Sequence, residues 1–229
     1  MRYALLIGVL SILVFAIITG CNSSLPDDGR ASDGQVPSGD IYETTEKVIT
    51  PAEIQNGEKV DLGCCVNEIL VRDTALIGEN SITVTAKDFI MTLNSDKKSY
   101  STTDIVTMWG TLEYVGDNDS IEIWSSCPFM LFTIAGGKVF GSGMGGSVVD
   151  VLVSSTLEKG RVYHFDYQKS GGWSADDPNA SFWESFFSEE ELLLPVGEYT
   201  ITLSGSFGFT ENVMESYVGL KTELIIVIL

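Results

Sequence analysis

Alternating apolar and polar residues dominate the second half of the chain and predict β-strands. Residues 82–86 alternate strictly, which places one side of a strand toward a core and the other toward solvent. Similar short segments, rich in Val, Ile, Thr, Tyr and Phe, follow and are separated by Gly, Asn, Asp and Pro. The predicted strand segments are 81–93, 104–116, 120–126, 128–134, 147–155, 161–168, 197–207 and 220–229. Such a series predicts an all-β fold, an antiparallel β-sandwich or barrel, with the last segment in the core.

The segment 176–195 interrupts this pattern and predicts a short helical insertion. Asp177 is placed to cap a helix whose first position is Pro178. Ser188 and Glu191 have the spacing of a capping box, which predicts a further helical turn.

Aromatic residues cluster in and just before this insertion. Trp173, Phe182, Trp183 and Phe186 form the candidate binding surface, with Phe187 beside them. The alternative is that the same rings pack the insertion onto the sandwich. If part of the cluster is exposed, the flanking residues Asp176, Asp177 and Glu184 favour neutral or cationic partners.

A second kind of hydrophobic pattern stands at the beginning of the chain. Residues 4–20 are uncharged and almost all apolar and follow Arg2, as in a secretory signal. The end of this run, Ile18-Thr19-Gly20-Cys21, resembles the lipobox of bacterial lipoproteins. The resemblance implies cleavage before Cys21, a diacylglyceryl group on its thiol, a palmitate-type chain on its amino group, and anchoring on the extracytoplasmic face of the cell membrane. An uncleaved anchor or an ordinary signal peptide are the alternatives.

These patterns divide the chain into four parts. We expect a signal peptide at 1–20, a flexible tether at 21–45, a partly β N-terminal extension at 46–86, and a sandwich domain at 87–229. The tether is predicted because the stretch after Cys21 has few apolar residues and cannot offset the entropy lost on ordering.

Charge narrows the range of partners. The chain has 13 Lys and Arg against 32 Asp and Glu, a net charge of −19. A strongly acidic surface repels phosphate backbones, so nucleic acid is excluded as a partner.

Three cysteines remain if Cys21 is lipidated. Cys127 can form a bridge with Cys64 or Cys65, the adjacent pair can form a vicinal bridge, or all three can be buried free thiols. A zinc site is not predicted, because the pair is adjacent and the chain has one histidine.

Other candidate chemistry is weak. Gly141, Gly143 and Gly146 match GxGxxG, but strand-like segments flank them, which predicts a hairpin loop and no nucleotide cofactor. His164 lies on the polar side of a predicted strand, and no GxSxG motif accompanies it. Asp117 and Asp119 lie in a loop that is typical of a β-turn and lacks the pattern of a calcium loop. The sequence therefore predicts neither a catalytic centre, a cofactor nor a metal.

Several strand entries resemble a known family. The segment 88–140, the stretch STLEKGRVYHFDY and the stretch LLPVGEYTITLSGSF are similar to the intracellular proteinase inhibitor domain of bacilli over about 87–209. The resemblance implies an Ig-like antiparallel sandwich and, for the founding members, protease inhibition. No reactive-loop residue matches. Our predicted core residues are Trp109, Tyr114, Ile123, Val151, Tyr199 and Ile201.

The sequence thus predicts a lipid-anchored, non-catalytic binding module for a protein, peptide or glycan. A regulator of extracellular proteases is the first alternative, and an enzyme of the cell envelope is the second.

Overall fold

The computed structural model describes residues 57–62, 69–141, 143–146 and 148–229. All of them belong to the compact unit Thr45–Leu229. The predicted signal peptide, lipidation site and tether lie outside the described residues, as do Cys64 and Cys65.

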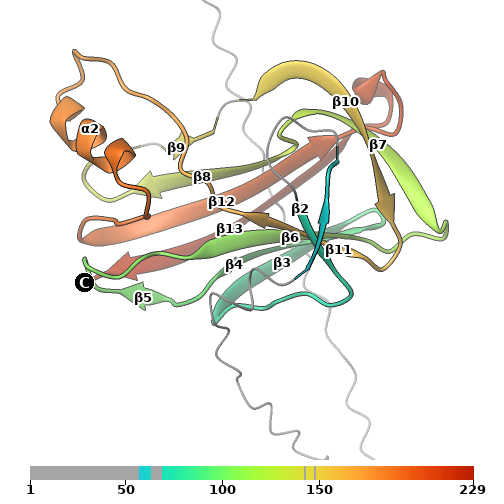
Figure 1. Ribbon diagram of the computed structural model, residues 1–229, viewed down its shortest axis with the longest axis horizontal. Helices are drawn as coiled ribbons and strands as arrows, with labels where there is room; N and C mark the ends of the chain where they lie inside the picture. Colours follow the sequence, from blue (N-terminus) through green and yellow to red (C-terminus); the bar gives the residue numbers. More distant parts are fainter. Residues whose placement is uncertain (1–56, 63–68, 142, 147) are drawn as a thin grey trace, which may run out of the picture. The chain divides into compact units, whose positions relative to one another are not determined.

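The described chain is an all-β sandwich with a short α-helix, as the alternating pattern predicted (Figure 1). One sheet contains, in spatial order, β1 (Glu58–Val60), β2 (Ile69–Arg72), β11 (Val162–Asp166), β6 (Met108–Tyr114), β4 (Phe89–Ser95) and β3 (Asn80–Ala86). The other contains β5 (Ser99–Tyr100), β13 (Val218–Ile228), β12 (Gly197–Phe207), β8 (Met130–Gly136) and β9 (Met144–Gly145). The strands β7 (Ser120–Cys127) and β10 (Val149–Glu158) form a two-stranded sheet. The helix is α2 (Ala180–Ser188), and η1 (Val213–Glu215) is a 3-10 turn.

The core lies between the two large sheets. Phe89 of β4 and Phe207 of β12 meet edge to face, with ring centroids 4.8 Å apart. The sheets approach closely at Gly110 of β6, where a Cβ atom would lie 2.5 Å from Cδ2 of Leu203. Strand β13 alternates buried and exposed residues along its whole length, because one face packs on the core and the other faces solvent.

Five of the six predicted core residues are buried. Ile123, Tyr199 and Ile201 are 0 % exposed and Tyr114 is 1 % exposed, which confirms those predictions. Trp109 is also 0 % exposed, but it is buried on the outer side of the six-stranded sheet together with His164. Val151 is 47 % exposed, so its prediction as a core residue was wrong. Its strand reaches the core only in its second half, where Ser155 and Leu157 are buried.

Tyr199 also forms a turn contact at the start of β12. Its hydroxyl donates to the carbonyl oxygen of Pro195 at 2.9 Å, the arrangement known in sandwiches as a tyrosine corner. The contact fixes the approach of the chain to β12, so the Pro-x-Gly-x-Tyr pattern positions this ring at the start of a core strand.

The predicted strand at 81–93 is two strands. β3 and β4 form an antiparallel hairpin in which Ala86 pairs with Phe89. The chain turns at Lys87, whose φ of 51° is left-handed, and this single residue breaks the alternation. The expected boundary between the N-terminal extension and the sandwich domain, at 86/87, falls at this turn. On either side of it, β3 and β4 belong to the same sheet and pair along the whole length of β3.

Cys127 ends β7 and is disulfide-bonded. The interpretation of three buried free thiols is therefore wrong for Cys127, whose partner lies outside the described residues. Within the described part of the chain, no helix has the length and apolar character needed to cross a membrane.

Candidate functional site

The helix α2 docks on the sandwich through Phe140, a buried residue that follows β8. The Phe140 ring meets Trp183, Phe186 and Tyr199 edge to face, with centroids 5.2, 5.4 and 5.5 Å away. Trp183 and Phe186 are 7 % and 5 % exposed. Two of the four candidate binding residues therefore hold the insertion in place, and they have little surface left for a ligand.

The helix begins later than the sequence predicted. Its first residue is Ala180, with Asn179 at the N-cap position and no side-chain capping bond. Asp177 instead accepts the backbone N–H of Asn179 at 2.7 Å, a local turn that competes with helix capping. The capping box at Ser188 does not form, since the Ser188 hydroxyl donates to the carbonyl oxygen of Ser185 and the helix ends there.

Lys169, from the segment before the insertion, caps the C-terminal end of α2. Its Nζ donates to the carbonyl oxygens of Phe186, Glu189 and Glu191 at 2.8, 2.7 and 2.6 Å. The ammonium also lies 4.4 Å from the centroid of the Phe186 ring. Partial burial lowers the pKa of Lys169, while Glu189 and Glu191 oppose that shift. A cation at a helix C-terminus is stabilised by the helix dipole, and here it also joins the helix to the segment that follows.

Trp173 is the exposed member of the candidate set. It is 42 % exposed and stacks on Phe187, with ring centroids 5.5 Å apart and planes 6° from parallel. Phe182 is half-buried and lies against Phe140. The exposed aromatic surface of the insertion is therefore the Trp173–Phe187 pair. Phe187 was not one of the four candidate residues predicted from the sequence.

The glycine-rich loop lies close to Phe187 of this aromatic pair. Its residues Met144 and Gly145 form β9, which pairs with β8, and the next element is strand β10. Because no helix follows, the loop lacks the geometry of a dinucleotide site. Met144 also lies close to Gly171, where a Cβ atom would be 3.2 Å from the Phe187 ring and 3.6 Å from the Met144 sulfur. The structure thus brings the glycine-rich loop close to the segment that precedes the helical insertion.

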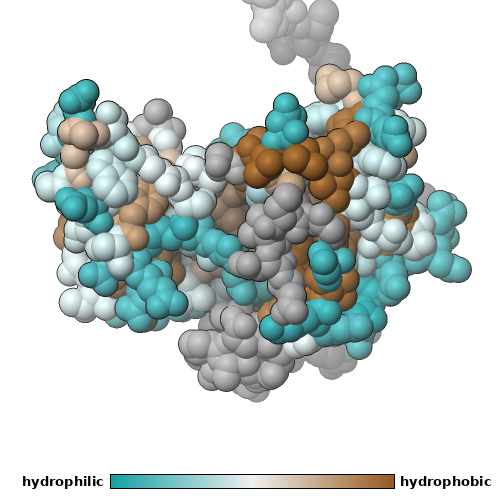
Figure 2. All heavy atoms as spheres, turned by 45° about the horizontal axis from the view of Figure 1, so that its top comes forward, coloured by the Kyte–Doolittle hydropathy of each residue, from teal (hydrophilic) through white to brown (hydrophobic). Residues whose placement is uncertain are grey.

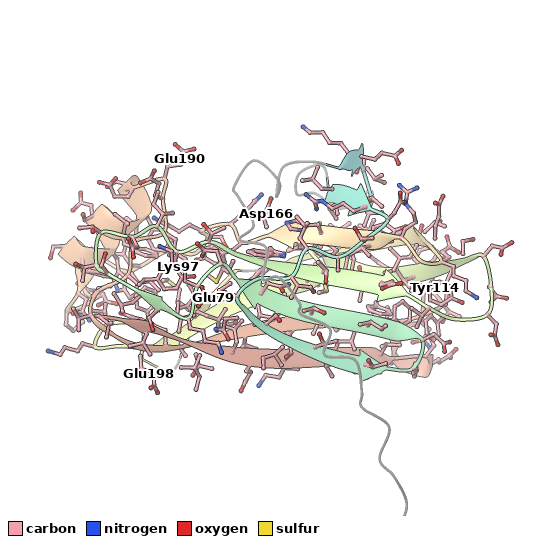
Figure 3. The ribbon with its side chains drawn as sticks, turned by 90° about the horizontal axis from the view of Figure 1, so that it is seen from below. Glu79, Lys97, Tyr114, Asp166, Glu190 and Glu198 are labelled. Carbon is pink, nitrogen blue, oxygen red and sulfur yellow. The ribbon has the colours of Figure 1, made fainter. Side chains whose placement is uncertain are left out.

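Acidic side chains surround this end of the domain. Asp176 and Glu184 are exposed, each three residues along the chain from a member of the aromatic pair. Figure 3 shows Glu190 and Glu198 pointing outward at the end that carries α2. A ligand with negative charge would be repelled here.

His164 lies in a buried polar row on the outer side of the six-stranded sheet. It is 2 % exposed, its Nε2 lies 2.8 Å from Oδ1 of Asp166, and its ring stacks on Trp109 with centroids 6.1 Å apart. Its Nδ1 makes no hydrogen bond within the described residues. The prediction of a histidine on the polar side of a strand is confirmed, and the burial of that side was not predicted.

The acidic loop at Asp117 and Asp119 connects β6 to β7 as a series of bends. Among the residues that the structure describes, no three His, Cys, Asp or Glu side chains gather in a way that would hold a metal ion.

Val148 and the first half of β10 form an exposed apolar surface, although the sequence pattern predicted a core residue here, Val151. Val148, Val149, Val151 and Leu152 are 47, 50, 47 and 48 % exposed. Figure 2 shows hydrophobic side chains gathered over this part of the domain, with hydrophilic residues around them. The signal available in the sequence was an apolar run without clean alternation, which does not fit a half-buried strand.

No protein-family model matches this chain, and no curated protein sequence matches it. The assignment of a function therefore depends on the surfaces described above.

Proposed function

We propose that this protein is a lipid-anchored binding module on the extracytoplasmic face of the cell membrane. The lipobox-like sequence at Cys21 supports the anchor, since two or more acyl chains hold a protein stably on a bilayer. The disulfide at Cys127 supports an oxidising compartment outside the cytoplasm.

The Trp173–Phe187 pair is the observation that carries the binding role. Phe187 stacks parallel to the indole of Trp173, and the 42 % exposure of Trp173 leaves part of that ring accessible to a flat, weakly polar ligand. Phe187 is held in place, because Trp183 and Phe186 pack α2 onto Phe140 and Lys169 binds the carbonyl groups at the helix end, and Trp173 stacks on this fixed ring. A rigid aromatic plane loses little entropy on binding, which favours stacking of a sugar ring. The surrounding carboxylates restrict the ligand to a neutral or cationic glycan.

The anchor predicts that Cys21→Ser releases the protein from membranes or leaves it unprocessed. The thiol is the acceptor of the lipid, and serine cannot replace it. Fractionation of cells followed by mass spectrometry of the N-terminus measures both results. Ser23→Ala is the matched control, and it should stay on the membrane. Normal processing and membrane retention of Cys21→Ser would contradict the anchor.

The binding surface predicts saturable binding of amino sugars and N-acetyl sugars. The mature domain is titrated with chitotriose in mildly acidic buffer, with tri-N-acetylchitotriose, and with an anionic trigalacturonate. We expect a change in tryptophan fluorescence with the first two and none with the third. Trp173→Ala should weaken binding at least about tenfold, because an aromatic anchor dominates a small interface. Its melting temperature should stay close to that of the wild type, because Trp173 is exposed.

Tyr217→Ala is the control, since Tyr217 is a 50 % exposed aromatic residue away from α2. Equal binding of all three sugars, or unchanged binding by Trp173→Ala, would reject this surface. A large loss of stability in Trp173→Ala would instead assign the ring to packing.

A further inference from the structure

A second surface, the outer edge of β10, has the features of a docking site for an extended peptide. β10 pairs with β7 on one side. On its other side, the described strands include no partner for β10. Among the described residues, the hydrogen bonds that reach this strand from beyond β7 are at Ser155 and at its end, Glu158. The Glu158 carbonyl oxygen accepts the N–H of Arg161, and the Glu158 N–H donates to the Tyr163 hydroxyl. A strand edge with free N–H and C=O groups is a template for another strand.

The first half of this edge is lifted away from the core. Val149 pairs with Cys127 and Val153 pairs with Ser125, so three residues on β10 stand opposite one on β7. This bulge leaves Val151 and Leu152 about half exposed on both faces of the strand. Further along, Ser155 returns to the core and its hydroxyl donates to the carbonyl oxygen of Leu62 at 2.7 Å. The free apolar stretch therefore has a defined end.

A hollow adjoins the same stretch. It has a volume of about 300 Å³, and its walls include Val148, Leu131, Pro128 and Tyr217. This space is large enough for an apolar side chain of a bound peptide. Lys221 also borders the hollow, but its Nζ lies 2.7 Å from Glu223 and its charge is paired.

The charges around the stretch select the partner. Asp150 is exposed within it. Glu122 and Glu158 are exposed further along the same two-stranded sheet, beyond Ser155. The chain as a whole has a net charge of −19, so a second copy of the protein would be repelled at this edge. A segment with Lys or Arg between its apolar residues would pair its positive charges with the carboxylates and pack its apolar side chains on the valines.

We propose that the edge of β10 that no described strand covers binds an extended segment of a partner protein, in which apolar residues alternate with Lys or Arg. The segment adds a strand to β10 by main-chain hydrogen bonds, and its apolar side chains cover Val149, Val151 and Leu152. This surface is separate from the Trp173–Phe187 pair and does not depend on sugar binding there.

The test uses the mature domain and capped octapeptides of defined sequence. One peptide alternates Val and Lys, a second alternates Val and Glu, and a third is the Val-Lys peptide with N-methyl groups on one backbone edge. Calorimetry measures each affinity at low and moderate salt. We expect the Val-Lys peptide to bind, with at least about tenfold weaker binding of the other two. Binding should also weaken with salt, since exposed charges contribute.

The double variant Val149→Lys and Val151→Lys should weaken binding of the Val-Lys peptide at least about tenfold. The matched control is Val196→Lys with Ile225→Lys, which places the same charges on residues that are 61 % and 54 % exposed elsewhere. It should bind as the wild type does. The proposal would be overturned if the Val-Lys peptide does not bind or if the Val-Glu peptide binds equally well. It would also be overturned if N-methylation has no effect or if the two double variants have equal effects. A dimer of the wild type that the β10 variant dissociates would also overturn it, because a second copy would then cover this edge.

Discussion

Phe140→Ala is expected to lower the free energy of unfolding by about 3–5 kcal/mol, the usual cost of removing a buried phenylalanine. Phe140 is 4 % exposed and contacts Trp183, Phe186 and Tyr199, so its loss opens a cavity between α2 and the sandwich. Urea unfolding measures the change. We also expect a red shift of tryptophan emission in the folded state, because Trp183 loses its packing partner.

Phe140→Leu is the matched variant, since it keeps most of the volume and loses the edge-to-face contacts. Its cost should be clearly smaller than that of Phe140→Ala. Met214→Ala, at a residue that is 79 % exposed, should leave stability within about 0.5 kcal/mol. A small effect of Phe140→Ala would mean that α2 is not docked on this residue, and the rigid support assigned to the Trp173–Phe187 pair would then be lost.

Loss of the disulfide at Cys127 is expected to cost about 2–5 kcal/mol. Cys127 is 0 % exposed and lies at the end of β7, next to the apolar stretch of β10 that pairs with it at Val149. Cys127→Ala and wild-type protein in reductant should therefore show similar, lowered melting temperatures, measured by differential scanning calorimetry.

Reductant should have no further effect on Cys127→Ala. The single variants Cys64→Ala and Cys65→Ala identify the partner, because the one that removes the bridge should behave as Cys127→Ala does. If reductant leaves the wild type unchanged in melting temperature, the bridge does not stabilise the domain.

The two proposed surfaces carry different chemistry on one scaffold. The Trp173–Phe187 pair offers an aromatic plane near the exposed carboxylates Asp176 and Glu184, which suits a sugar. The edge of β10 offers main-chain hydrogen bonds and aliphatic side chains, which suits a peptide. The two surfaces use different residues and different ligands. The sugar-binding experiment and the peptide-binding experiment can therefore fail independently of each other.

The alternating pattern of the sequence determined the all-β fold and most of its strands. The period of two residues is a local property, so residues 197–207 matched β12 fully and Tyr199 and Ile201 were found in the core. The turn at Lys87 was missed, because a single left-handed residue leaves little trace in a hydrophobic pattern.

Only the tertiary structure decided which apolar residues are covered. The sequence showed that Phe182, Trp183 and Phe186 lie close together in the insertion. Whether Trp183 is buried depends on its contact with Phe140, which comes from a loop distant in sequence. Val151 resembles a core residue in sequence but lies in the bulged first half of β10, where it is 47 % exposed. Lys169 closes α2 from outside the helix, at a distance along the chain that no capping motif encodes. Local patterns specify an element and its apolar side, whereas contact between elements distant in sequence specifies which of those sides remain free to bind.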